Sequence, residues 1–257
     1  MARLFGTRTG ASLPKCREAT SGVGSIDVRL NPVGVVIPAY QEGPRIAAVV
    51  RAARQFVPVL VVDDGSTDDT AARAESAGAT VVRQLQNQGK GAALRTGFRL
   101  ALEHGAAAVI TLDADGQHDP AEIPAFLDAF HASRPELVIG RRDFSAMPPV
   151  RRASNSLGRL VLSSALGVDV PDNQSGYRLI GSRLMGVLLD SREAGFEFEV
   201  EMIARCIALD LPLTWVPIRT IYGGEPSHIR PLAHFMSFLR VVRDARRIVR
   251  APKDRRP

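Results

Sequence analysis

Short apolar runs alternate with amphipathic stretches along the first half of the chain. Apolar runs bounded by turn residues are typical of buried strands, and they occur at 33–37, 58–62, 80–85, 107–112 and 136–140. Between them, apolar residues recur at helical spacing at 44–55, at 91–103 and at 120–131, and a further helix is expected from the turn DDGSTDDT to about residue 76. This alternation predicts an α/β fold: an open, mostly parallel sheet with helices on both faces.

The pattern changes after residue 140, where a basic loop with prolines interrupts the alternation. Three helices are expected beyond it, at 153–166, 182–190 and 197–209, together with two strands, at 177–180 and 213–218. We therefore expect one domain over residues 31–228, with a first half at 31–140 and a second half at 141–228.

The last segment, residues 229–257, is expected to form a basic amphipathic helix over 232–249 and a tail. One face of the helix is apolar, and arginines crowd the rest: Leu232, Phe235, Met236, Leu239 and Val242 against Arg240, Arg243, Arg246, Arg247 and Arg250. Such a helix either lies on an anionic membrane surface or packs its apolar stripe on the domain. The sequence leaves both alternatives open.

Composition and charge narrow the class of protein. The 257 residues are 45% hydrophobic and 23% charged, which fits one α/β domain with a C-terminal extension. The formal charge is +6, and residues 229–257 hold nine Lys and Arg against two Asp and Glu, a local balance of +7 that leaves the rest of the chain close to neutral. A basic protein can bind nucleic acid, but the chain has no nucleic-acid motif and only 5% aromatic residues. Nucleic acid is therefore not expected as a partner.

Two features bear on location. Cys16 and Cys206 are the only cysteines and lie far apart, which suits neither a zinc site nor a disulfide framework and favours a reducing compartment. No apolar run reaches the roughly 18 residues that span a bilayer. Residues 1–30 lack the apolar stretch of a signal peptide and are expected to be a disordered leader. A cytoplasmic protein is therefore expected.

Polar residues follow four of the expected strands. They are the segment 38–42 (PAYQE), the pair Asp63 and Asp64, the segment 87–91 (NQGKG) and the segment 113–117 (DADGQ). In open α/β sheets, ligands bind beyond the carboxyl ends of the strands. We therefore expect these four clusters to form one site.

Asp113 and Asp115 carry the strongest chemical signal. Two carboxylates at a strand end suit a hard divalent cation, which is usually held by one or two carboxylates plus phosphate oxygens. Gln117 could add a neutral oxygen, while Asp119 is better placed than either aspartate to cap the next helix. These residues predict Mg²⁺ or Mn²⁺ bound together with a diphosphate leaving group.

Several other side chains could complete the site. Tyr40 could stack on a base or ribose, and Glu42 could accept hydrogen bonds from ribose hydroxyls. Asp63 or Asp64 could accept from a base N–H, although either could simply cap a helix. Lys90 is a cation near the same edge and could meet phosphate. A short basic segment adds guanidinium groups, which suit phosphate: Arg141, Arg142, Arg151, Arg152 and Arg159.

Together these residues resemble the inverting glycosyltransferases of family 2, and within them the dolichyl-phosphate or polyprenyl-phosphate sugar transferases such as the mannosyltransferases. The matching segments occur in the family's order over about residues 33–228: VVIPAYQE, VVDDGSTDDT, NQGKGAALRTG, TLDADGQHDP, VIGRR and DNQSGYR. The resemblance implies a GT-A-like fold. It makes 31–140 the nucleotide-sugar-binding half and 141–228 the acceptor half.

The resemblance also implies roles for individual residues. The nucleotide would contact Pro38, Tyr40, Glu42, Asp63, Asp64, Lys90, Asp113 and Ala114. Asp113, Asp115 and Gln117 would hold the metal ion. Asp115, Arg142, Arg152 and Asp172 would act in catalysis. Arg152, Ser156, Arg178 and His228 would meet the acceptor.

The resemblance implies transfer of a sugar from a donor of the GDP-mannose or UDP-glucose type, with inversion, to a polyprenyl phosphate at the cytosolic face of a membrane. An anionic phosphate needs no base, whereas a hydroxyl acceptor in cell-envelope glycan synthesis would need a carboxylate such as Asp172, Glu197 or Glu199. His228 stands where the mannosyltransferases would have lysine, so donor and acceptor both stay open.

Rival classes lack their own signatures. A sugar-nucleotide pyrophosphorylase would have a Gly- and Arg-rich loop after the first strand, and a dinucleotide oxidoreductase would have G-x-G-x-x-G there. The chain has PAYQE at this turn. A further alternative is a membrane adaptor that has lost its catalytic activity. Loss of a metal-binding carboxylate would favour this alternative, but Asp113 and Asp115 are both present.

Overall fold

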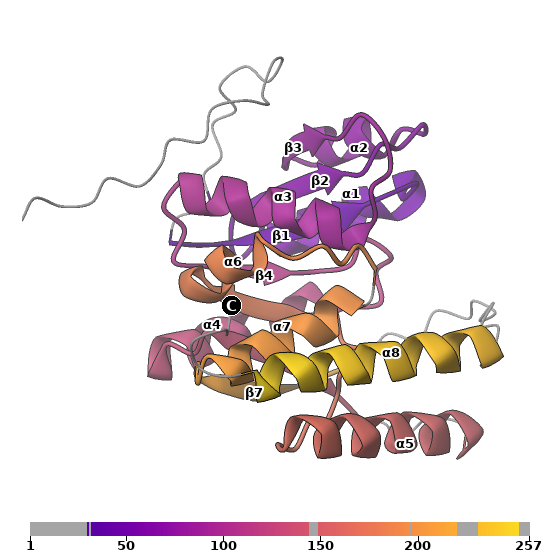
Figure 1. Ribbon diagram of the computed structural model, residues 1–257. Coiled ribbons are helices and arrows are strands. Elements are labelled where there is room, and N and C mark those ends of the chain that lie inside the picture. Colours follow the sequence, from indigo (N-terminus) through magenta and orange to yellow (C-terminus); the bar gives the residue numbers. More distant parts are fainter. Residues whose placement is uncertain (1–29, 31, 144–148, 196, 220–230, 252–257) are drawn as a thin grey trace, which may run out of the picture.

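The computed structural model describes residues 30, 32–143, 149–195, 197–219 and 231–251, and for 149–155 and 231–237 the backbone alone. A seven-stranded sheet in the order β3-β2-β1-β4-β6-β5-β7 forms its centre (Figure 1). The strands are β1 (Val33–Ala39), β2 (Val59–Asp63), β3 (Thr80–Arg83), β4 (Ala108–Thr111), β5 (Leu137–Arg142), β6 (Arg178–Gly181) and β7 (Leu213–Ile218). The expected open, mostly parallel sheet is confirmed.

One strand departs from the parallel arrangement. β6 lies between β4 and β5 and runs antiparallel to both, while every other pairing is parallel. Its four residues are all buried, as are those of β4. A strand buried on both faces has the same apolar pattern in either direction, so the sequence could not reveal this reversal.

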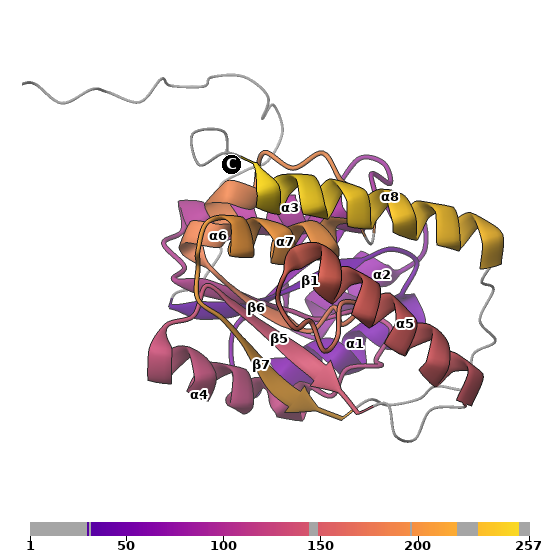
Figure 2. The ribbon, with the colours of Figure 1, turned by 60° about the horizontal axis from the view of Figure 1, so that its bottom comes forward.

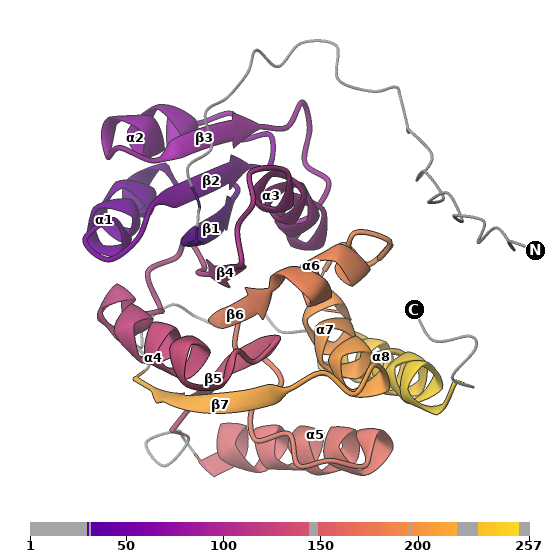
Figure 3. The ribbon, with the colours of Figure 1, turned by 90° about the vertical axis from the view of Figure 1, so that its left-hand side faces the viewer.

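Helices cover both faces of the sheet (Figure 3). One face carries α1 (Gly43–Ala53), α2 (Thr70–Ser76) and α4 (Ile123–Ser133), the last preceded by the short helix η1 (Pro120–Glu122). The other face carries α3 (Lys90–Glu103), α6 (Ser182–Leu188) and α7 (Glu197–Ala208). β1 shows why both faces are covered, because strand side chains alternate between them. Val35 and Ile37 pack with the helices of the first face, and Val36 packs with those of the second.

Two long helices lie beyond the second face. α8 (Pro231–Arg250) packs against α7 and against α5 (Pro149–Leu166) (Figure 2). Among the described side chains of α8, Val241, Val242 and Ala245 are buried, whereas Leu239, expected on the same face as Val242, is 42% exposed. In its described part, α8 therefore uses an apolar stripe to pack on the domain, one of the two alternatives left open by the sequence.

Other expectations meet the structure only in part. No helix among the described residues is long and apolar enough to cross a membrane. Cys206 is buried with a free thiol, and Cys16 lies outside the described residues. The expected leader also lies outside them, except for Leu30, which is 1% exposed and belongs to the core.

Candidate active site at the carboxyl edge of the sheet

An open pocket of about 410 Å³ lies at the carboxyl ends of β1, β2 and β4. Residues from all four polar clusters line it, as the sequence predicted: Pro38, Ala39, Tyr40, Glu42, Asp64, Asn87, Gly89, Lys90, Ala93, Asp113, Ala114 and Asp115. Its volume is in the range of small-molecule sites. Four lining residues were not singled out from the sequence: Ala39, Asn87, Gly89 and Ala93, of which the first three belong to the segments PAYQE and NQGKG.

Asp113 and Asp115 are brought to the pocket by the loop that follows β4. The backbone N–H of Gln117 donates to Asp115 Oδ1 over 2.9 Å, which orients this carboxylate. The side chain of Gln117 is exposed and is absent from the pocket lining, so its expected role as a third ligand has no support in this geometry. Asp119 caps the next helical turn by accepting from Ala121 N, as expected.

The two carboxylates fit a hard divalent ion. Both line an open pocket and offer only oxygen atoms, and the described residues contain no cluster of three or more His, Cys, Asp or Glu side chains that could enclose an ion. An ion at Asp113 and Asp115 would therefore need further ligands from a phosphate or from water. That is the usual coordination of Mg²⁺.

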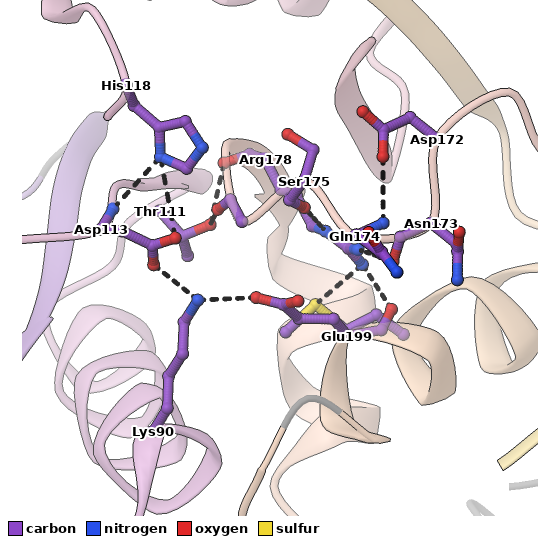
Figure 4. A network of polar contacts seen from close by, with 12 residues as sticks. Lys90, Thr111, Asp113, His118, Asp172, Asn173, Gln174, Ser175, Arg178 and Glu199 are labelled. Carbon is purple, nitrogen blue, oxygen red and sulfur yellow. Dashed lines mark hydrogen bonds and ion pairs between the residues drawn. The ribbon is translucent and has the colours of Figure 1, made fainter. Parts of the chain in front are cut away.

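Lys90 occupies an unexpected place at the base of this site. Its ammonium lies 2.5 Å from Asp113 Oδ1 and 2.7 Å from Glu199 Oε1 (Figure 4). Burial is the largest influence on the pKa of Asp113 and raises it, but the charges of Lys90, His118 and Arg178 and the hydrogen bond from Lys90 together outweigh burial and hold that pKa below its usual value. Lys90 was expected to meet nucleotide phosphate, yet in this structure its charge is already shared between two carboxylates.

Asp63 and Asp64 have separate surroundings. Asp64 lines the pocket, and its oxygens accept from Gln88 N over 2.9 Å and Gly89 N over 2.8 Å. Asp63 is fully buried outside the pocket lining, where it accepts from Ser66 N and from Arg83 Nε, each over 3.0 Å. Of the two aspartates expected to contact the nucleotide, the structure therefore brings only Asp64 to the pocket.

The turn after β1 presents Tyr40 to the pocket mouth, with 47% of its surface exposed. Gln41 has a φ of 58°, a conformation uncommon outside glycine. Its backbone N–H donates to the Ser66 hydroxyl over 3.0 Å, and that of Glu42 donates to the Thr70 hydroxyl over 2.8 Å. These bonds hold the turn after β1 against the segment that follows Asp64. Pro38 and Ala114, also expected to contact the nucleotide, line the same pocket.

Arg142 and Asp172 form a bidentate ion pair beyond the end of β5. Arg142 Nε lies 2.7 Å from Asp172 Oδ2, and its Nη2 lies 2.9 Å from Oδ1. The backbone N–H groups of Arg142 and Gln174 also donate to this carboxylate, which is 2% exposed. Asp172 was a candidate general base, but it is buried outside the pocket lining, and both of its oxygens are bonded to the guanidinium of Arg142.

Arg178 is fully buried and therefore does not point into the pocket, where an acceptor contact was expected. Its guanidinium donates to three backbone carbonyls, those of Ser175, Asn173 and Glu199. Burial lowers the pKa of this group. In this structure Arg178 ties the segment 172–178 to the first turn of α7 (Figure 4).

The remaining acceptor residues are less well defined. Ser156 is exposed on α5. The side chain of Arg152 lies outside the described residues, although its backbone belongs to α5, and His228 lies outside them altogether. Their expected roles therefore stay predictions.

Gly176 is a further site residue that reasoning from the sequence did not select. Its carbonyl accepts from the Thr111 hydroxyl over 2.7 Å. A Cβ atom added there would lie 2.5 Å from Asp113 Oδ2 and 2.9 Å from Lys90 Nζ. A side chain at this position would therefore displace the ion pair, because the backbone of the segment 172–178 passes directly over it. Only the segment DNQSGYR, quoted for its family resemblance, pointed to this region.

Comparison with known proteins gives a consistent family match. The family model described as "Glycosyl transferase family 2" matches residues 34–185. An undecaprenyl-phosphate mannosyltransferase of Micrococcus luteus is 33% identical over 198 residues, which cover 71% of this chain and 81% of that protein. A polyprenol monophosphomannose synthase of Mycolicibacterium smegmatis is 31% identical over 229 residues, with coverage of 80% and 84%.

A solved structure shares the fold. Glucosyl-3-phosphoglycerate synthase from Mycobacterium tuberculosis, in complex with Mn²⁺, UDP-glucose and phosphoglyceric acid, superimposes with a TM-score of 0.63. The match covers 83% of this chain and 77% of that one at 22% identity. It supports the GT-A-like architecture expected from the sequence.

Proposed function

The chain belongs to glycosyltransferase family 2, and on that premise we propose that it transfers a sugar from a nucleoside diphosphate sugar to a polyprenyl phosphate, with a divalent ion at Asp113 and Asp115. We infer a donor of the GDP-mannose or UDP-glucose type and inversion at the anomeric carbon. The observation that carries this proposal is the convergence of both carboxylates with Tyr40, Asp64 and Gly89 around one pocket.

The pocket offers complementary groups to each part of such a donor. Tyr40, half exposed at the mouth, presents a ring on which a base or ribose can stack. Glu42 lines the same wall and supplies a carboxylate for ribose hydroxyls. Asp113 and Asp115 would hold Mg²⁺ or Mn²⁺ against the diphosphate, and such an ion supplies charge neutralisation on the leaving group.

The proposed chemistry is a single in-line displacement. A phosphate oxygen of the acceptor attacks the anomeric carbon opposite the diphosphate, the new C–O bond forms, and the electrons of the broken bond leave with the nucleoside diphosphate. Because the acceptor oxygen is already anionic near neutral pH, no proton has to be removed. Arg142, oriented by Asp172, supplies a guanidinium suited to phosphate beyond the end of β5.

The choice of acceptor rests on the relatives and on the outer surface. The bacterial relatives at 31% and 33% identity are named for undecaprenyl phosphate and polyprenol phosphate. Leu157 and Leu160 on α5 are 60% and 62% exposed, and α8 adds exposed arginines, among them Arg240 and Arg246. Apolar side chains beside arginines suit an anionic membrane surface. We therefore propose peripheral contact with the cytosolic face of a membrane.

This membrane contact can be tested with vesicles of phosphatidylcholine and phosphatidylglycerol. The variants Leu157→Ser/Leu160→Ser and Arg240→Glu/Arg246→Glu should each sediment less with these vesicles than the unmodified protein. Arg73→Glu on the exposed face of α2 is the matched control and should bind unchanged. Equal sedimentation of all variants would contradict the membrane contact.

Two alternatives make different predictions. A hydroxyl acceptor would need a general base, and among the candidate bases Glu199 is the one joined to Asp113 through Lys90. The variant Glu199→Gln would then abolish transfer, whereas a phosphate acceptor would still react. A degenerate membrane adaptor would bind no donor at all.

The deciding experiment is calorimetric titration with nucleoside diphosphates and their sugars, with and without Mn²⁺. We expect one GDP- or UDP-sugar to bind only in the presence of Mn²⁺, and binding to disappear in Asp115→Ala. Polyprenyl phosphates would then be tested as acceptors with that donor. Absence of binding to every nucleotide by folded protein with Mn²⁺ would overturn the proposal in favour of the adaptor.

A further inference from the structure

Lys90 is a cation built into the proposed metal site. Its ammonium is 2.5 Å from Asp113 and 2.7 Å from Glu199, so one of the two metal carboxylates is already paired with a positive charge (Figure 4). Asp115 has no such partner: among the described residues, its carboxylate receives only the N–H of Gln117. The two carboxylates are therefore unequal before any ion arrives.

We propose that Lys90 is a positioning residue that makes ion capture depend on the donor: it disfavours a bare divalent cation at Asp113 and Asp115 but admits the ion together with a diphosphate. This inference rests on the proposed metal-dependent donor site. The class of ligand that it selects is a metal–nucleoside diphosphate complex.

The surroundings of Lys90 keep the ammonium in place. Glu199 is 7% exposed at the first turn of α7, where its own carbonyl accepts from the buried Arg178. Gly176 closes the opposite side, since a Cβ there would lie 2.9 Å from Lys90 Nζ. Lys90 is thus held next to Asp113 by its second ion pair, with Glu199 on α7, and the backbone of Gly176 lies close to the ammonium.

The sign of the charges gives the selectivity. A bare divalent cation placed at Asp113 lies close to the ammonium of Lys90 in a partly buried site, where like charges repel strongly. In a complex with a diphosphate, the negative phosphate oxygens offset the charge of the ion. The oxygens also interact favourably with the ammonium. Lys90 therefore weakens capture of the free ion much more than capture of the complex.

Glu199 sets the strength of this effect. It shares the ammonium with Asp113, so part of the positive charge is drawn away from the metal carboxylate. Without Glu199, Lys90 would pair with Asp113 alone and would oppose a bare ion more strongly. Changes at Lys90 and Glu199 should therefore shift the affinity for the free ion in opposite directions. A role in folding alone would not produce opposite shifts.

The test measures binding of Mn²⁺ alone, followed by the loss of the free-ion signal in electron paramagnetic resonance. Lys90→Met should bind Mn²⁺ at least tenfold more tightly than the unmodified protein. Glu199→Gln should bind Mn²⁺ more weakly than the unmodified protein. In Lys90→Met, Asp113 and Glu199 face each other without a counterion. The double variant Lys90→Met/Glu199→Gln removes that repulsion and the extra carboxylate, and it should still bind Mn²⁺ more tightly than the unmodified protein.

A second titration adds a nucleoside diphosphate. In the unmodified protein the nucleotide should tighten Mn²⁺ binding markedly, and in Lys90→Met this gain should shrink. If folded Lys90→Met and the double variant both bind Mn²⁺ no more tightly than the unmodified protein, the inference is wrong while the proposed function stands. If the unmodified protein shows no coupling between Mn²⁺ and any nucleotide, the proposed function fails and the inference fails with it.

Discussion

Two pocket carboxylates of the first half, Asp64 and Asp115, and two carboxylates of the second half, Asp172 and Glu199, are fixed in different ways. In residues 31–140, Asp64 and Asp115 accept backbone N–H groups from nearby loops. In residues 141–228, Asp172 and Glu199 are paired with the side-chain cations Arg142 and Lys90. A backbone N–H is available whatever the residue type, whereas a side-chain cation can be lost by one substitution.

This difference separates function from stability. Removing a carboxylate of the first kind frees a backbone N–H at an open pocket, where water can replace it. Removing Asp172 takes away the bidentate partner of the partly buried Arg142, which is strongly destabilising, whereas Lys90 keeps Asp113 as a partner when Glu199 is removed. Substitutions of Asp64 or Asp115 should therefore affect ligand binding alone, and substitution of Asp172 should also affect folding.

The largest effect on transfer activity is expected for Asp115→Asn, which tests whether a carboxylate bonded to a backbone N–H acts in ligand binding alone. Transfer should fall about 10³-fold, because charge stabilisation of the leaving group is lost. The midpoint of urea denaturation should hardly move, since this side chain makes a single hydrogen bond at the pocket. Gln117→Ala is the control and should keep Mn²⁺ affinity within about twofold, because Gln117 acts through its backbone. A collapse of Mn²⁺ binding in Gln117→Ala would restore that side chain as a ligand.

A stability effect of about 3 kcal/mol is expected for Arg178→Met in the second half. The substitution leaves the carbonyls of Ser175, Asn173 and Glu199 buried without their donor. Urea denaturation would measure the change in the free energy of unfolding. A loss below about 1 kcal/mol would mean that water satisfies these carbonyls and that the guanidinium does not hold the segment.

Asp172→Asn should lower kcat/KM for the acceptor about 100-fold, because Arg142 loses a bidentate partner and its fixed orientation. The dissociation constant of the donor should stay within about twofold, which a general loss of structure would not allow. Adding Arg142→Met to this variant should cost little more, since the two residues act as one unit. Additive losses would show that they act independently.

The smallest effect is expected for Arg73→Ala. Arg73 and Asp69 form a surface pair, with both side chains about half exposed. Exposed pairs four residues apart on a helix contribute about 0.3–0.5 kcal/mol. Urea denaturation should therefore show a change in unfolding free energy of that size, and donor binding should not change. A larger loss would mean that the contrast between the two halves does not depend on burial.

Much of the donor side could be predicted from sequence. Its clusters follow successive parallel strands, and parallel strands end at one edge, so proximity follows from topology. The difference between Asp63 and Asp64 could not be predicted in this way. The two are adjacent, and only the packing of Arg83 and of the loop at Gln88 and Gly89 decides which one faces the pocket.

The acceptor side depended on contacts that no local pattern contains. Arg178 could be assigned to an acceptor from its motif, but the structure buries it against three carbonyls. Lys90 and Glu199 are 109 residues apart in sequence and meet because α3 and α7 cover the same face of the sheet. The close approach of Gly176 to Asp113 and Lys90 likewise depends on how the segment 172–178 crosses above that pair.

The order of strands and helices along the chain and the set of polar residues at the strand ends could be predicted from the sequence alone. Hydrophobic periodicity and turn residues are local properties, and they suffice for that. The reversed strand β6, the burial of Arg178 and the sharing of Lys90 between Asp113 and Glu199 became visible in the tertiary structure. These features depend on contacts between residues far apart in the sequence, and such contacts exist only after the sheet and its helices have packed.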